Sequence, residues 1–141
     1  MRSKRIQPIA KHADQLQQQA VQIFVAAQKS VVDAQLQLEQ LIEYRSEYNR
    51  GRKNHHLNAI QLKDYQAFLN KLNQSIEQAR MNILQKKQIC EQQKLNWLKT
   101  RSRSKALDAV IVKYQMQEAK IEARIEQKEQ DEFASRIKRP D

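Results

Sequence analysis

The chain has very little of what strands, loops and catalytic pockets are built from. Its 141 residues include one glycine, two prolines and one cysteine, and aromatic residues make up 6% of it. Turns and strand ends depend on glycine and proline, so their scarcity favours an all-helical fold. A single cysteine excludes an intramolecular disulfide, and a single glycine excludes a glycine-rich phosphate-binding loop.

Long hydrophobic runs are missing as well. The hydrophobic fraction is 40% and the mean hydropathy is −0.88, values that suit a thin helix–helix interface better than the thick core of an enzyme. No stretch approaches the roughly 20 apolar residues that cross a bilayer, and the basic start MRSKRIQP is not followed by an apolar signal core. We therefore expect a cytoplasmic protein.

The second half carries an apolar stripe in three-four spacing. The stripe consists of Leu62, Tyr65, Leu69, Leu72, Ile76, Ala79, Ile83, Cys90, Trp97, Leu107, Ile111, Tyr114, Ile121 and Ile125. A seam of this kind must be covered by another helix, because an isolated helix cannot bury it. The pattern predicts one very long helix that serves as a contact device. Cys90 is interpreted as a small buried hydrophobe of this seam.

The first half carries a second stripe, and one turn separates the two. This stripe consists of Ile9, Ala13, Leu16, Ala20, Ile23, Ala27, Val31, Ala34, Leu38 and Leu41. Pro8 and Pro140 are expected to bracket the helical region. The segment NRGRKNHH at 49–56 holds the only glycine and breaks the periodicity, so we expect a hinge near Asn54. After it, Asn58 and Gln61 form a capping box, and Leu57 and Leu62 occupy the positions of a hydrophobic staple.

These patterns predict an all-α fold, an antiparallel two-helix coiled-coil hairpin with a longer C-terminal helix. One domain covers 1–141, with a helix at about 8–49, a turn at about 50–57, a helix at about 58–135 and a short basic tail. This register places Tyr44 near Tyr65 and Ala13 near Trp97. At about 1.5 Å per residue the helices measure about 65 Å and over 100 Å, so roughly the last 30 residues overhang.

The overhang is expected to bind a partner. The first helix is predicted to be too short to cover its apolar residues, which are Leu107, Val110, Ile111, Tyr114, Ile121 and Ile125. Burying each large side chain contributes about 1.5 to 3 kcal/mol, from which association entropy subtracts much. Self-association into a dimer or a four-helix bundle explains the periodicity as well as a foreign partner does.

The charge balance favours acidic partners. Lys and Arg number 26 and Asp and Glu 16, which gives a formal net charge of +10. Basic clusters lie at 2–5, 50–53, 101–105 and 136–139, and acidic residues gather between Glu118 and Glu132. Nucleic acid and anionic lipid both match the charge. However, the aromatic residues do not interleave with the basic clusters as base-stacking platforms would, so no nucleic acid is expected.

No combination of residues predicts catalysis, a metal site or a cofactor. His55 and His56 are adjacent, so they would point to different sides of a helix and could not chelate one ion as an i, i+4 pair does. His12 is isolated, and the glutamates of the second half fit the solvated face of a helix. We interpret the chain as a non-enzyme.

A further set of residues lies on the flank of the predicted hairpin near its turn. On each helix the residues step by 4, 3 and 4, and the two rows are Gln37, Leu41, Tyr44 and Tyr48, then Phe68, Leu72, Ser75 and Ala79. Exposed Tyr and Phe clusters on a polar helical surface mark protein contacts. The alternative is that the tyrosines fill the core at the hairpin end.

Three segments in order resemble the FliJ family of flagellar export proteins over nearly the whole chain. They are LIEYRSEY at 41–48, YQAFLNKL at 65–72 with IEQ at 76–78, and DEFA at 131–134 before a basic Arg-Pro tail. The resemblance implies a two-helix antiparallel coiled coil similar to the central stalk of rotary ATPases.

The resemblance also implies partners. FliJ proteins contact the ring-forming export ATPase of the flagellar type III secretion system, promote its assembly and hydrolysis, and bind the large cytoplasmic part of the membrane export gate. They are also linked to traffic of export chaperones. The two flank rows above carry the family's gate-binding surface, with Ser75 and Ala79 as its less typical members. By analogy with the rotary stalk, the overhang with Leu107, Ile111, Tyr114, Ile121, Ile125 and Phe133 would contact the ATPase ring. Such a protein would be cytoplasmic and peripheral to the inner membrane at the flagellar base.

Two alternatives stay open. An equivalent stalk protein of an injectisome would have the same architecture, although the Tyr and Phe motifs favour the flagellar branch. A basic coiled-coil scaffold that binds nucleic acid or anionic membrane is the other, and a steep loss of binding with salt would reveal it.

Overall fold

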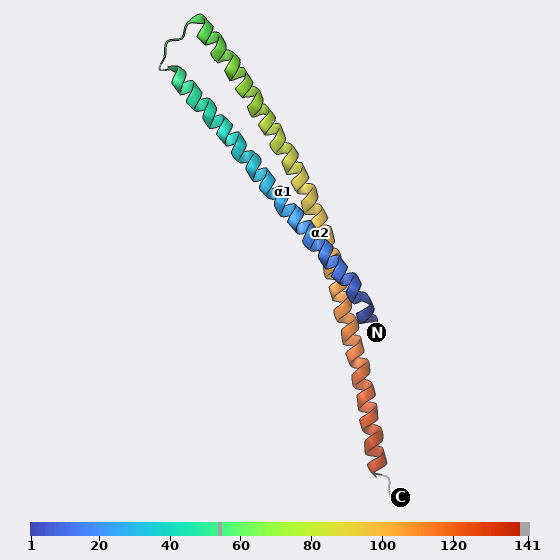
Figure 1. Cartoon of the computed structure of the whole chain (residues 1–141). Coiled ribbons are helices and arrows are strands. Elements are labelled where there is room, and N and C mark those ends of the chain that lie inside the picture. Colours follow the sequence, from blue (N-terminus) through green and yellow to red (C-terminus); the bar gives the residue numbers. More distant parts are fainter. Residues whose placement is uncertain (54, 139–141) are drawn as a thin grey trace. The chain divides into compact units, whose positions relative to one another are not determined.

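Two helices account for almost all of the chain. The computed structural model describes residues 1–53 and 55–138, in which α1 spans Arg2–Lys53 and α2 spans Ala59–Lys138. The helices pack against each other as a hairpin, and the second is the longer, so the predicted fold class is confirmed (Figure 1). The predicted hinge residue Asn54 and the tail residues Arg139 and Pro140 lie outside the described residues.

The helix ends differ from those predicted. α1 begins at Arg2, so Pro8 lies inside the helix, and Gly51 is helical because α1 continues to Lys53. Gly51 does not have a positive φ, so the backbone gives it no reason to stop the helix. α2 begins where the capping box predicts: Gln61 N–H donates to Asn58 Oδ1 at 2.8 Å, and Asn58 N–H donates to Gln61 Oε1 at 3.1 Å.

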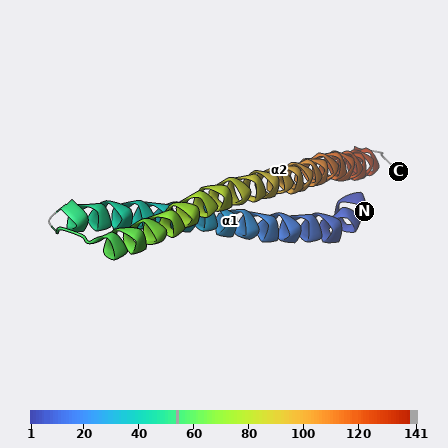
Figure 2. The ribbon, with the colours of Figure 1, turned by 90° about the horizontal axis from the view of Figure 1, so that it is seen from above.

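The chain divides into two compact units, Met1–Gln19 with Leu98–Asp141, and Ala20–Trp97. The single domain over 1–141 stays a prediction. In the unit Ala20–Trp97, α1 and α2 are antiparallel, and they cross in the view of Figure 2. Its buried hydrophobic residues are Ala20, Ala34, Tyr65, Leu72, Ile76, Ala79 and Ile83. The bulky members come from α2, and α1 supplies alanines against them.

The apolar stripe predicted for the first half of the chain is only partly buried. Ala13, Ala20 and Ala34 are buried as predicted, but Ile9, Leu16 and Ile23 are exposed. The branched residues lie beside the row of alanines, at seven-residue intervals of their own. A helix that presents alanine to its neighbour allows close approach, and the larger side chains are then left on the flank.

The register also differs from the prediction. Trp97 stacks on Phe24 with ring centroids 5.6 Å apart, rather than lying near Ala13. Tyr65 stacks on Tyr48 rather than lying near Tyr44, which is one turn earlier. α1 continues by about one turn past the predicted end, which accounts for the shift of the Tyr65 partner by one turn but not for the larger shift at Trp97.

Candidate functional site

Three aromatic rings form a continuous cluster near the turn in the unit Ala20–Trp97. The Phe68 ring lies 4.5 Å from the Tyr48 ring and 6.2 Å from the Tyr44 ring, centroid to centroid, and the second contact is edge to face. Tyr44 is 50% exposed and Phe68 is 37% exposed. Since edge-to-face and tilted rings attract each other beyond their area burial, the cluster is a defined surface and not a set of independent side chains. We call Tyr44, Tyr48 and Phe68 the aromatic patch.

Tyr65 supports the aromatic patch from below. Its ring is parallel to that of Tyr48, with centroids 4.9 Å apart, and its side chain is 5% exposed. Its hydroxyl donates a hydrogen bond to Asn49 Oδ1, and the Arg52 guanidinium lies 4.6 Å from its ring centroid. These contacts satisfy the phenol oxygen and hold the ring in one orientation. The sequence placed Tyr65 on the seam, but only the structure assigns it this supporting role.

The eight predicted gate-binding residues do not all lie on the surface. Gln37, Tyr44, Phe68 and Ser75 are exposed, and Leu41 and Tyr48 are half-buried. Leu72 and Ala79 are buried and belong to the core between the helices, so their placement on an exposed stripe was wrong. Positions 65, 72 and 79 repeat every seven residues, and this spacing keeps Leu72 and Ala79 on the same face as the buried Tyr65. The alternative that the tyrosines of the flank fill the core does not hold for Tyr44, which is exposed, whereas Tyr48 is half-buried.

Two hollows lie at opposite ends of the predicted surface. One, of about 360 Å³, is lined by Gln37, Leu41, Ser75, Gln78, Ala79 and Asn82. The other, of about 650 Å³, lies at the hairpin end, and Tyr48, Gly51, Leu57, Tyr65 and Phe68 contribute to its walls. Four of the eight predicted residues line the first hollow and two line the second. The aromatic patch therefore lies between the two hollows, and its members Tyr48 and Phe68 form part of the wall of the hollow at the hairpin end.

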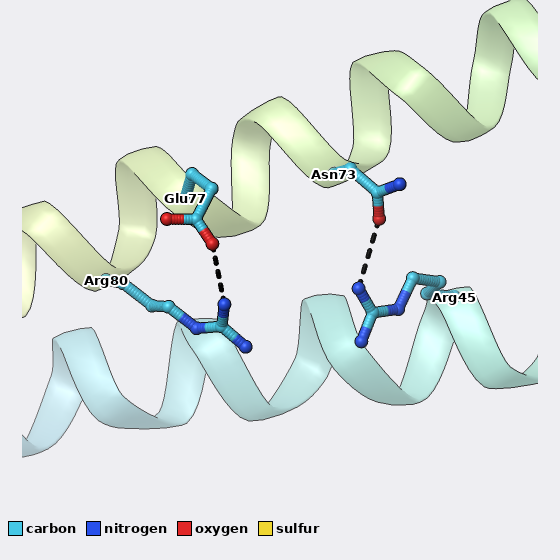
Figure 3. Close-up of polar contacts among 4 residues, drawn as sticks. All are labelled: Arg45, Asn73, Glu77 and Arg80. Carbon is cyan, nitrogen blue, oxygen red and sulfur yellow. Dashed lines mark hydrogen bonds and ion pairs between the residues drawn. The ribbon is translucent and has the colours of Figure 1, made fainter.

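A polar contact joins the helices beside this region. The Arg45 guanidinium donates to Asn73 Oδ1 at 3.0 Å, from α1 to α2 (Figure 3). Farther along α2, Arg80 and Glu77 form an ion pair at 2.6 Å within the same helix. Both contacts are exposed, and exposed ion pairs contribute about 0 to 1 kcal/mol, so neither adds much stability; only the Arg45–Asn73 contact joins the two helices.

The start of α1 is hydrogen-bonded to α2 within the unit that consists of Met1–Gln19 and Leu98–Asp141. Ser3 is buried, and its Oγ and N–H donate to the two Glu118 carboxylate oxygens at 2.7 Å and 3.2 Å. The Arg2 guanidinium lies 5.8 Å from the Tyr114 ring centroid. α1 has no acidic residue in its own first turn, so Glu118 supplies the negative charge that a helix N-terminus favours. We call the contacts between Ser3 and Glu118 the anchor.

The exposed overhang of α2 begins later in the sequence than predicted. Leu107, Ile111 and Tyr114 are half-buried, so the expectation that the first helix is too short to cover them was wrong. The physical reason is that α1 begins at Arg2, which places Ser3 against Glu118. Beyond Glu118, the residues from 121 to 137 are all exposed, including Ile121, Ile125 and Phe133.

The hydrogen bonds at the anchor change the acidity of Glu118. Donation by the Ser3 hydroxyl, and then by the Ser3 N–H, holds the pKa of Glu118 below its usual value. The positive N-terminus and Lys4 act in the same direction, because each favours the ionised carboxylate.

Metal-ligand clusters and membrane-spanning helices are absent from the residues that the structure describes. Within 1–53 and 55–138, no group of three His, Cys, Asp or Glu side chains could hold a metal ion. Over the same residues, neither helix contains a stretch apolar enough and long enough to cross a membrane. Cys90 is half-buried on the seam of α2. We take the aromatic patch with its two hollows as the candidate functional site, because exposed rings in mutual contact lie there beside concave surface.

Comparison with known protein families identifies one family for this chain. A family model described as the flagellar FliJ protein matches residues 2–139. No curated protein sequence matches the chain closely enough to serve as a comparison.

Proposed function

Because the chain belongs to the FliJ family of flagellar proteins, and is thereby a component of the flagellar export apparatus, we propose that it is a non-enzymatic stalk. It promotes assembly and hydrolysis of the export ATPase ring and couples that ring to the membrane export gate. The observation that carries the proposal is the aromatic patch. Tyr44 and Phe68 are exposed aromatic side chains that contact each other across the two helices, at positions that match the family's gate-binding surface.

The gate contact uses the aromatic patch and the two hollows beside it. Tyr and Phe are effective contact residues because they bury much area and lose little conformational freedom. Here Tyr48 is held between Phe68 and the buried Tyr65, so part of that freedom is already lost in the unbound protein. The cytoplasmic domain of the gate protein is the partner in this proposal.

The ring contact uses the exposed end of α2. Ile121, Ile125 and Phe133 are all more than half exposed, and without a partner they remain in contact with water. Burying such side chains contributes about 1.5 to 3 kcal/mol each, which supports an interface at this end. The proposed ring contact also includes the neighbouring part of α2, where three half-buried residues lie: Leu107, Ile111 and Tyr114.

Two further elements of the proposal concern place and traffic. The protein is cytoplasmic and peripheral to the inner membrane, held at the flagellar base by its contacts with the export apparatus. It also assists the traffic of export chaperones. The family resemblance supports both statements, and the acidic and basic residues of the overhang between 118 and 132 offer charged contacts to such partners.

The gate contact is tested with the double variant Tyr48→Ala with Phe68→Ala. We expect binding of the purified gate cytoplasmic domain, measured by titration calorimetry, to be abolished while the helical circular dichroism signal stays near that of the wild type. Lys29→Ala is a control, because Lys29 is an exposed residue of the same unit outside the patch. Unchanged affinity in the double variant would refute the gate assignment.

The ring contact is tested by truncation after Lys120. This variant keeps the Ser3–Glu118 anchor and removes the exposed residues that follow. We expect it to bind the gate domain as the full chain does but to lose stimulation of the cognate export ATPase. A truncated protein that still stimulates hydrolysis and ring assembly would contradict the role of the overhang.

The scaffold that binds nucleic acid or anionic membrane is distinguished by salt. Contacts to phosphates weaken steeply as salt rises, whereas a contact through aromatic rings does not. Gate binding that persists from low salt to about physiological salt, where the Debye length is about 8 Å, supports the proposal. A steep loss over that range favours the scaffold. The family match is to a flagellar family, which favours the flagellar stalk over that of an injectisome.

A further inference from the structure

The hollow at the hairpin end contains the only glycine of the chain. Gly51 lies in the last turns of α1 and lines the cavity of about 650 Å³ together with Tyr48 and Phe68 of the aromatic patch. The residues of the family resemblance include Tyr48 and Phe68 but not Gly51. No other position of α1 is a glycine, so the glycine at position 51 needs a physical explanation.

The local structure does not require it. Gly51 does not adopt a positive φ, so an L-amino acid would fit the backbone. A Cβ built at Gly51 would meet no atom within 4 Å, so packing does not require the missing side chain either. Glycine inside a helix costs roughly 0.5 to 1 kcal/mol relative to alanine. Folding of the free chain would therefore be favoured by replacing it.

The position of Gly51 within the helix suggests what it does. Gln37, Tyr44 and Gly51 follow one another at seven-residue intervals, which keeps them on one flank of α1. Gln37 and Tyr44 are exposed on that flank. Gly51 continues their row into the hollow, where a side chain would fill space that is now open. A missing side chain lets another molecule approach the backbone closely.

We propose that this hollow is an anchor pocket for a large apolar side chain of the export gate's cytoplasmic domain, with Gly51 as the residue that keeps it open. The inference rests on the proposed gate contact and deepens it by naming what the partner inserts. The cavity of about 650 Å³ continues directly from the aromatic patch, with which it shares Tyr48 and Phe68.

The lining selects for an apolar protein side chain. Its aromatic and aliphatic walls are accompanied by charges of both signs, since Glu47, Asp64 and Arg52 also line it. The Arg52 guanidinium already lies over the Tyr65 ring. The two carboxylates disfavour a phosphate backbone, and a concave site does not match a flat membrane surface. The rings of Tyr48, Tyr65 and Phe68 instead provide an apolar wall for a side chain such as Phe, Leu or Trp.

The first experiment uses the glycine itself as the reporter and does not need the gate. Because the chain has one glycine, its amide gives one glycine signal in a nitrogen-15 correlation spectrum. We expect that signal to shift saturably when indole, a stand-in for a large apolar side chain, is added to the full chain. Phe68→Ala, which removes one wall of the hollow, should weaken the response. A Gly51 signal that does not move up to the solubility limit of indole would overturn the proposal.

The second experiment changes the size of the residue at position 51. In Gly51→Ala and Gly51→Leu the helix should become more stable, while affinity for the gate domain should fall with side-chain size, by about tenfold or more for leucine. Ser46→Leu is the matched control, since it adds the same side chain at an exposed position about 140° around α1 from Gly51. It should bind as the wild type does.

The outcomes separate this inference from the proposed function. If Gly51→Leu binds the gate domain like the wild type while Tyr48→Ala with Phe68→Ala does not, the gate contact stands and the anchor pocket is refuted. If indole shifts the Gly51 signal but the wild-type chain does not bind the gate domain, the gate contact fails and the hollow remains an apolar side-chain site. Equal losses in Gly51→Leu and Ser46→Leu would refute the pocket, since added hydrophobicity alone would explain them.

Discussion

Substitution of Leu72 separates a structural effect from a binding effect at the candidate site. Leu72 matches the family's gate-binding surface, yet it is 7% exposed in this structure. Leu72→Ala should therefore lower the free energy of unfolding and should alter gate affinity much less than Phe68→Ala does. Phe68 is exposed, and its loss removes a contact surface instead of a core side chain.

The size of the effect follows from burial. Truncating a buried leucine to alanine costs about 2 to 5 kcal/mol, depending on how far the surroundings collapse. A two-helix interface has few layers and can close partly around a cavity, so we expect the lower part of that range, about 2 to 3 kcal/mol. Leu72→Met, which conserves volume, should cost less than about 1.5 kcal/mol.

Urea unfolding followed by helical circular dichroism measures the stability change, and calorimetric titration with the gate domain measures affinity. The titration must be carried out at a temperature at which the Leu72→Ala variant is fully helical. The reasoning would be refuted if Leu72→Ala unfolded at the same urea concentration as the wild type but lost gate affinity, because Leu72 would then act from the surface.

Three other predictions follow from local contacts. Asn58→Ala removes the side-chain acceptor of the capping box and should destabilise the start of α2 by about 1 kcal/mol, measured by urea unfolding; no change would mean that water replaces the cap. The pKa of Glu118 is lowered in the folded chain, so its stabilising effect is present above the ordinary carboxyl value of 4.5 and is lost as the pH falls through the lower folded value. The protection factor against hydrogen exchange at the start of α1 should therefore fall in acid in the wild type and lack this step in Glu118→Gln; equal pH profiles of the protection factor would contradict the anchor. Phe24→Ala removes the ring stacked on Trp97, and should shift the Trp97 fluorescence towards that of exposed indole; an unchanged spectrum would argue against the stack.

The sequence predicted the elements of the fold because their signals are local. Scarcity of glycine and proline and the three-four spacing gave two helices, and the Asn58 and Gln61 pair gave the start of α2. The central part of the α2 seam was also predicted, since bulky residues such as Ile76, which is 1% exposed, mark it clearly. Its two ends were predicted wrongly, because Leu62 at the start and Ile121 and Ile125 at the end are exposed. The Tyr and Phe residues of the aromatic patch could be named from spacing and family resemblance.

Only the tertiary structure decided which of these residues face each other. Periodicity cannot show that α1 packs through Ala13 and Ala20 while Ile23 stays outside, because both choices have helical spacing and the outcome depends on how closely α2 approaches. Nor could it show that α1 runs through Pro8 to Arg2, since the contact at this end, Ser3 with Glu118, joins residues far apart in the chain. The same long-range register buries Leu72, sets Tyr65 beneath Tyr48 and opens a hollow at Gly51. Local preference determined the helices, and packing between them determined the site.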